Sequence, residues 1–161
     1  ADKLVVMADG KVRREGPLAE VLADVKMPIE TENGASVVLS GKVSSLSCEW
    51  KTCCIGAGGW AFEAPTASLA MGSQVRLRIL ARDVSIAVEK PDSISIRNRL
   101  QAEVEEIAAH PSEPAYQLVK LKCPNGEGRL VSRILRQSVT EHGLHPGSQV
   151  WALVKASAVI M

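Results

Sequence analysis

A four-residue sequence that occurs twice constrains the fold of this chain more than any other feature. Gly-Ser-Gln-Val stands at residues 72–75 and again at residues 147–150, seventy-five residues later. The same offset aligns Val84 with Val159 without a gap. A repeat of this length is typical of a chain in which one supersecondary unit is followed by a second copy. We therefore expect two related units in tandem.

Short runs of apolar and β-branched residues follow one another in the second copy. Each run reads as a strand, because turn residues such as proline and glycine separate it from the next run. A helical turn is predicted between Ile134 and His142, and Gly143 is predicted to end it. Closely spaced short strands are typical of a small barrel. The predicted strands are 99–107, 117–123, 128–133 and 149–161.

The first residues read differently from the rest of the chain. Asp9 and Gly10 form a strong hairpin-turn signal between two strand-like runs. Gly16 and Pro17 are predicted to begin a helix, because the apolar residues that follow recur at helical spacing and Pro28 ends the pattern. These apolar residues are Leu18, Val21, Leu22 and Val25.

The chain begins inside a hydrophobic run, which suggests a piece of a longer polypeptide. Together, the distinct first residues and the repeat lead us to expect three segments. Residues 1–27 form a short mixed head, residues 28–90 the first unit and residues 91–161 the second unit.

Composition and charge argue against several classes of partner. The net charge of +1 gives no bulk attraction to nucleic acid or to an anionic membrane surface. No apolar run is long enough to span a bilayer, and the first residues do not show a signal-peptide pattern. The few aromatic residues are scattered and make no platform for single-stranded nucleic acid. We expect a cytosolic protein that binds no nucleic acid and does not insert into a membrane.

The cysteines favour packing over metal binding. Zinc sites usually combine two closely spaced pairs of ligands, and no second Cys-x-x-Cys or nearby histidine pair accompanies Cys53 and Cys54. Adjacent residues of a strand face opposite ways, so these two thiols cannot easily hold one ion. We expect no metal site, and thiols packed in strands within a reducing compartment.

Motifs for nucleotide chemistry and for catalysis are missing. The sequence has no Gly-x-x-x-x-Gly-Lys-Ser/Thr phosphate loop, so we expect the chain neither to bind nor to hydrolyse ATP. The glycine-rich residues 56–59 precede a strand-like run, which favours a hairpin over a phosphate cradle. None of the three histidines accompanies a nucleophile elbow. The chain is therefore predicted to be non-enzymatic.

Two short polar segments offer a cation and a hydroxyl each. On extended backbone Ser95 shares a face with Arg97, and Lys155 shares a face with Ser157. A tetrahedral oxyanion accepts hydrogen bonds from all sides, and such cations neutralise its charge. Solvated strand faces often show the same alternation, so the pattern alone leaves both interpretations open.

A resemblance to a known family favours the oxyanion. Ser-Ile-Arg-Asn-Arg-Leu at residues 95–100 and the closing residues 143–161 resemble the molybdate-binding (MOP, or TOBE-type) domain. Residues 76–98 resemble more narrowly the C-terminal region of the molybdate importer's ATP-binding subunit. Residues 1–22 are similar to the segment that ends an ABC-transporter ATPase domain.

The resemblance implies both a fold and a ligand. The fold would be mainly β, with tandem small OB-like barrels behind a short β-hairpin and helix left from the ATPase domain. The ligand would be molybdate or tungstate, held between the two chains of a homodimer. By the same resemblance, Ser95, Arg97 and Asn98 of one chain, together with Lys155, Ala156 and Ser157 of its mate, would bind the oxyanion.

One position departs from the family pattern. Some family members place a hydroxyl near residue 135, where this chain has Leu135, and Ser132 is the nearest substitute. In the first unit, Leu80 and Arg82 replace Lys155 and Ser157 at the repeat offset, so that unit is predicted to be a scaffold.

The implied function is regulatory. The chain would sense oxyanion on the ATP-binding subunit of a molybdate importer, peripheral to the inner membrane and in contact with the permease subunit. Two alternatives remain open. One is a structural dimerisation module with a degenerate anion site, and the other is an accessory domain of an importer for another substrate.

Overall fold

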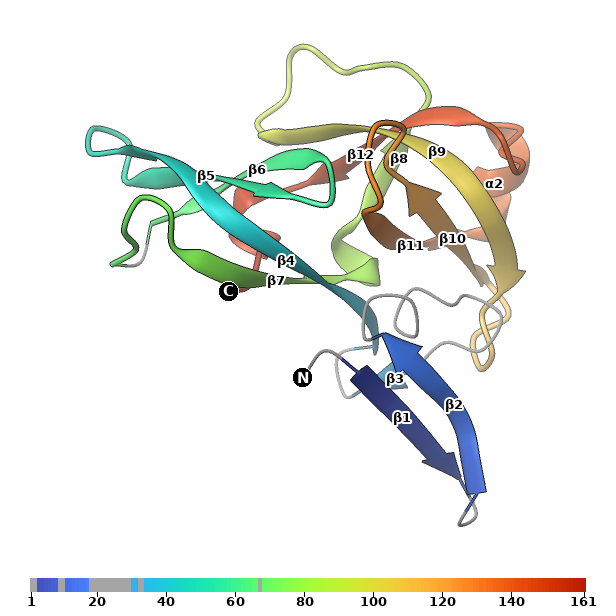
Figure 1. Ribbon diagram of the computed structural model, residues 1–161. Coiled ribbons are helices and arrows are strands. Elements are labelled where there is room, and N and C mark those ends of the chain that lie inside the picture. The colour runs from blue at the N-terminus through green and yellow to red at the C-terminus, as the bar shows by residue number, and fades with distance from the viewer. Residues whose placement is uncertain (1–2, 9–10, 18–29, 32–33, 67) are drawn as a thin grey trace.

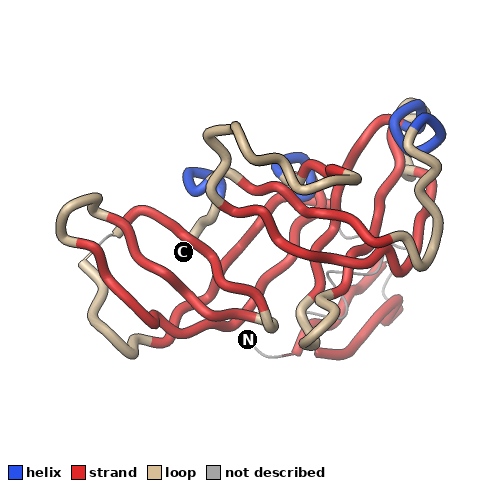
Figure 2. The backbone as a smooth tube through the Cα atoms, turned by 90° about the horizontal axis from the view of Figure 1, so that it is seen from above, coloured by secondary structure: helices blue, strands red, loops and turns tan. Residues whose placement is uncertain are grey.

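Antiparallel strands make up most of the computed structural model, which describes residues 3–8, 11–17, 30–31, 34–66 and 68–161 (Figure 1). The described residues form a two-stranded hairpin and two five-stranded sheets. The few helical turns lie at the ends of strands (Figure 2). The prediction of a mainly β fold is confirmed.

The first sheet is organised around one long strand. Its strands are β3 (Glu30–Thr31), β4 (Gly34–Ser47), β5 (Thr52–Ala57), β6 (Trp60–Pro65) and β7 (Gln74–Leu80). They follow the order β3-β4-β5-β6, and β7 pairs with the first half of β4. A 3-10 turn, η1 (Ala81–Asp83), follows β7.

The second sheet has the order β11-β10-β9-β12-β8. In chain order its strands are β8 (Ser85–Ala87), β9 (Asn98–Ala109), β10 (Tyr116–Lys122), β11 (Arg129–Leu135) and β12 (Gln149–Val154). Helix α2 (Arg136–Glu141) follows β11, and the 3-10 turn η2 (Ala156–Ala158) follows β12. The strands predicted at 99–107, 117–123 and 128–133 are confirmed, with ends shifted by one or two residues.

Alternation along the strands builds the core. On β5 and β6, Cys53, Ile55, Phe62 and Ala64 are buried while their neighbours face outward, so the opposite orientation predicted for Cys53 and Cys54 is confirmed. One hydrophobic cluster joins these side chains to those of the second sheet. The two sheets therefore share a core.

Two local predictions about turns are also confirmed. Gly58 and Gly59 connect β5 to β6 with φ angles of 64° and 96°, as a two-residue hairpin requires. Gly143 ends α2 with a φ of 59°, and the N–H of Leu144 donates to the carbonyl of Val139 at 3.0 Å. Leu144 is buried after this helix end.

The repeat is confirmed in three dimensions. Gly72 and Gly147 both have positive φ, 77° and 98°. Each donates its N–H to a valine carbonyl on the long strand of its own unit, Val43 at 2.9 Å and Val104 at 2.7 Å. A 3-10 turn follows the next strand in both units.

In each unit, the segment after the 3-10 turn pairs with a strand of the other unit. β8 follows η1 and pairs with β12, where Ser85 lies opposite Leu153. Ile160 follows η2 and bridges to Arg78 on β7, with backbone hydrogen bonds of 2.7 and 3.1 Å, so the chain ends beside β7 (Figure 1). Ser85 and Ile160 are equivalent in the repeat. Each of the two units therefore contributes an equivalent segment to the other. The predicted boundary at residues 90 and 91 stays a prediction.

The strand predicted at 149–161 is too long. β12 ends at Val154, opposite Asn98, because Asn98 is the first residue of β9, the strand with which it pairs. The chain then turns, and the N–H of Ala158 donates to the carbonyl of Lys155 at 2.9 Å. Lys155 and Ser157 do not alternate on one strand, and Ser95 and Arg97 precede β9.

The head also differs from its prediction. β1 (Lys3–Ala8) pairs with β2 (Lys11–Pro17), which confirms the hairpin. Gly16 and Pro17 are the last residues of β2 and do not begin a helix, because they pair with the start of β1. A proline is tolerated at such a strand end. The predicted helical residues from Leu18 to Val25 lie outside the described residues.

None of the helices in the described part of the chain has the length and apolarity needed to cross a membrane.

Candidate functional site

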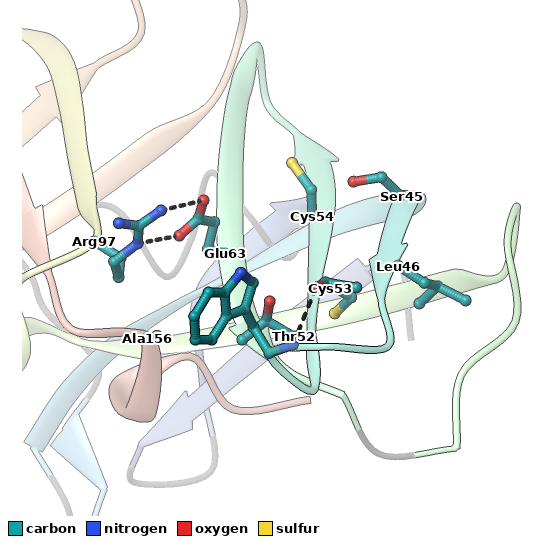
Figure 3. Close-up of a pocket in the computed structure, with 10 residues that line it drawn as sticks. Ser45, Leu46, Thr52, Cys53, Cys54, Glu63, Arg97 and Ala156 are labelled. Carbon is teal, nitrogen blue, oxygen red and sulfur yellow. Dashed lines mark hydrogen bonds and ion pairs between the residues drawn. The ribbon is translucent and has the colours of Figure 1, made fainter.

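A cavity of about 670 Å³ lies where the first unit meets the end of β12 (Figure 3). The first unit contributes Trp50, Cys54 and Glu63, among others, and the second unit contributes Arg97 and Ala156. Two of the residues predicted to bind the oxyanion therefore line one cavity within a single chain. Trp50 is 72% exposed, which leaves an indole on the surface beside this cavity.

Arg97 makes a two-pronged ion pair with Glu63 (Figure 3). Its Nε donates to Glu63 Oε2 at 2.6 Å, and its Nη2 donates to Glu63 Oε1 at 3.0 Å. Hydrogen bonding from Arg97 lowers the pKa of Glu63, and the carboxylate in turn raises the pKa of Arg97. The side chains are 64% and 39% exposed, so solvent screens the pair and it adds little to stability.

Asn98 holds the backbone of the same glutamate. The backbone N–H of Glu63 donates to Asn98 Oδ1 at 2.7 Å, and Asn98 Nδ2 donates to the carbonyl of Glu63 at 2.9 Å. β6 is the outer strand of its sheet, and this amide satisfies two backbone groups that an outer strand leaves unpaired. Asn98 is only 2% exposed, and its side chain positions β6.

The second predicted segment lies at the same end of the second unit. Val154, the last residue of β12, pairs with Asn98, the first residue of β9. Lys155 directly follows this pair, and Arg97 directly precedes it. Lys155 and Ser157 are exposed, and η2 packs against β6. Two cations that are far apart in the sequence therefore lie beside the paired ends of β9 and β12. They are Arg97 and Lys155. Ser95 is exposed in the loop before them.

Ser132 lies at a different contact. It is fully buried on β11, and its Oγ donates to the carbonyl of Val84 at 2.6 Å. Val84 follows η1, which packs against β11 as η2 packs against β6. This hydroxyl therefore joins the units at the equivalent contact and does not line the cavity with Arg97. Leu135 is 44% exposed.

Glu63 is a partner of Arg97 that the sequence did not indicate. Strand alternation predicts that it faces outward from β6, but no local pattern connects it with Arg97, which lies on the other unit. Only the way the two units pack brings these residues together. Trp50 and Cys54 reach the cavity for the same reason.

The described residues contain no group of three or more histidine, cysteine, aspartate or glutamate side chains that could hold a metal ion. Cys48, Cys53, Cys54 and Cys123 are free thiols. Two charged residues line the cavity, Arg97 and Glu63, and they are paired with each other. Lys155 is exposed next to the lining residue Ala156. The guanidinium suits an anion, and the Glu63 carboxylate opposes one.

Residues 94–161, which include Arg97 and the whole of β9 to η2, match the TOBE domain family. We refer to residues 94–161 as the TOBE domain of this chain on the basis of this match. Both predicted ligand segments fall within it, and the TOBE domain contributes Arg97 and Ala156 to the cavity. Glu63 comes from the unit before it.

Similar proteins cover both units. The "Molybdenum import ATP-binding protein ModC" of Pseudomonas fluorescens is 35% identical over 163 residues, which cover 99% of this chain and 44% of that protein. The protein of the same name from Thiobacillus denitrificans is 36% identical over 160 residues, which cover 99% of this chain and 43% of that protein. The chain thus spans less than half the length of these relatives.

A solved structure resembles the chain beyond the TOBE domain. The cytoplasmic molybdate-binding protein ModG, in a form with molybdate bound, superposes with a TM-score of 0.65 at 27% identity. The match covers 83% of this chain and 97% of ModG. The arrangement of two related units is therefore shared with a molybdate-binding protein.

Proposed function

We propose that this chain is a regulatory region that binds molybdate or tungstate on the ATP-binding subunit of a molybdate importer. The observation that carries the proposal is the position of Arg97 and Lys155 at one end of β9 and β12, beside a cavity that both units line. The likeness to ModC over 99% of the chain and to ModG over both units supports the choice of anion.

The residues have distinct roles in this proposal. Arg97 and Lys155 neutralise the oxyanion, since guanidinium and ammonium groups form the strongest hydrogen bonds to such oxygens. Ser95 and Ser157 donate from their hydroxyls, and Ala156 forms part of the wall. Asn98 acts by holding β6 in place, because its amide is already bonded to Glu63.

A second copy of the chain completes the site in this proposal. Trp50 and Leu46 expose apolar surface at the cavity, 72% and 38% respectively, which a partner would cover. In the homodimer, this end of each chain faces its copy across the two-fold axis, so that each anion site also receives Lys155 and Ser157 of the mate. Light scattering tests the dimer, and a monomeric mass at tens of micromolar protein with molybdate present contradicts it.

The parent subunit supplies the setting. We infer that it hydrolyses ATP in a domain outside this region, contacts the permease, and works on the cytoplasmic side of the inner membrane. The region itself would then bind no ATP and would report the oxyanion concentration to that machinery. In this proposal, binding of the oxyanion changes the contact that Arg97 makes.

A purely structural dimerisation module is the second candidate. The observation in its favour is that Arg97 is already paired with Glu63. Calorimetric titration with molybdate, tungstate, sulfate and phosphate separates the candidates. We expect heat from molybdate and tungstate at a lower concentration than from the smaller sulfate. No binding of any anion favours the structural module, and preference for sulfate or phosphate favours an importer of another substrate.

A further inference from the structure

Glu63 occupies the donors that an incoming oxyanion needs. Its two carboxylate oxygens accept from Nε and Nη2 of Arg97 at 2.6 and 3.0 Å. One edge of a tetrahedral oxyanion offers two oxygens to a guanidinium in the same way. The carboxylate therefore stands in for the anion at Arg97, and it cancels the charge that would attract one.

The competing carboxylate is held in place by the backbone. Both hydrogen bonds of the Asn98 amide go to Glu63, so β6 cannot slide along β9 without breaking them. Trp60, on the same strand, donates its Nε1–H to the carbonyl of Gln101 at 2.7 Å. These contacts fix the Cα of Glu63 beside Arg97, and only the side chain remains free to swing away.

Exposure allows the exchange to occur. The side chain of Arg97 is 64% exposed and that of Glu63 is 39% exposed, so an anion from solvent can reach the guanidinium. Surface ion pairs of this kind are weak, because water screens them. A dianion such as molybdate carries more charge than the carboxylate and meets Lys155 at the same end of the strands.

We propose that Glu63 is an internal competitor that sets the affinity of the site, because the oxyanion binds Arg97 by displacing the Glu63 carboxylate. This inference rests on the proposed oxyanion-binding function. The displaced bond joins β6 of the first unit to the TOBE domain, so anion binding exchanges a contact between units for a contact with ligand. The Asn98 hydrogen bonds remain in both states.

The test is calorimetric titration of molybdate into the full chain and its variants. Glu63→Gln keeps the shape of the side chain and removes its charge, and we expect it to bind molybdate roughly three- to tenfold more tightly. Glu63→Ala should show the same gain, which excludes a new hydrogen bond from the glutamine amide as the cause. Glu103→Gln is the matched control, since Glu103 pairs with Lys122 at 2.8 Å elsewhere on the second sheet.

Each outcome of the titrations either supports or overturns the inference. Tighter binding by both Glu63 variants, with the control equal to wild type, supports the inference, and so does binding that only the Glu63 variants show. Unchanged or weaker binding by the Glu63 variants, when wild type binds, overturns the inference and leaves the proposed function standing. No binding by any folded variant removes the proposed function and the inference together. Circular dichroism of each variant confirms that it is folded.

Discussion

The amide of Asn98 makes both of its hydrogen bonds to the backbone of Glu63, while the neighbouring Arg97 makes both of its ion-pair contacts to the Glu63 side chain. Two adjacent residues of the TOBE domain thus hold one residue of the preceding unit. Asn98, which makes the first contact, is buried, whereas both side chains of the Arg97–Glu63 pair are exposed. We propose that this division separates the stability of the fold from the binding of the anion.

Asn98→Ala should destabilise the fold. It removes the partner of two backbone groups on β6, and leaving buried polar groups unpaired costs about 1–3 kcal/mol. Urea unfolding measures the loss in the free energy of unfolding. Asn125→Ala is the control, because Asn125 is exposed in the turn after β10. Equal stability of the two variants would show that the Asn98 hydrogen bonds contribute nothing.

Lys155→Ala should weaken molybdate binding while the fold survives. Loss of a charge-assisted hydrogen bond costs on the order of 1.5–3 kcal/mol, which corresponds to roughly a tenfold to hundredfold loss of affinity. Lys122→Ala removes the same charge at the Glu103 pair and is the control in the same titration. If both variants lose affinity equally, general electrostatics explains binding and the site assignment of Lys155 is wrong.

The Arg97–Glu63 pair should contribute to stability at neutral pH and not in acid. Hydrogen bonding from Arg97 lowers the Glu63 pKa below its ordinary value of 4.5, so the folded state binds that proton less readily than the unfolded chain. The contribution is complete above the unfolded pKa and is lost as the pH falls through the lower folded pKa.

Comparison of wild type with Glu63→Gln in urea tests this dependence. The difference in unfolding free energy should be small at neutral pH, because both side chains are well exposed, and should shrink further in high salt. It should vanish in acid. Glu103 also has a lowered pKa through its hydrogen bond with Lys122, and it is unchanged in both proteins. A difference that persists in acid would mean that charge pairing is not its source.

Local signals predicted much of the architecture. The tandem units followed from Gly72 and Gly147, because glycine at each position adopts a positive φ that the turn before the strand requires. The end of α2 at Gly143 followed from the same physics. Strand periodicity predicted that Cys53 and Cys54 face opposite ways, and in the structure Cys53 is the buried one.

Contacts between residues far apart in the sequence could not be predicted from local signals. The alternation of Lys155 with Ser157 failed because β12 loses its partner where β9 begins at Asn98, and a strand's end depends on its neighbour. The exchange of β8 and Ile160 between units left no local pattern either. The contact of Glu63 with Arg97 depends on how β6 of the first unit packs against β9 of the second. Sequence therefore indicated the cations of the site and missed the carboxylate that opposes them.

Anomalous diffraction from crystals of this chain soaked in molybdate tests the central claim most directly, because molybdenum marks its own position. We predict a peak at the cavity lined by Arg97 and Ala156, within hydrogen-bonding reach of the Arg97 guanidinium, with the Glu63 carboxylate turned away. A peak at another place, or a molybdate-free cavity with Glu63 still bonded to Arg97 in crystals of saturated protein, would contradict the account.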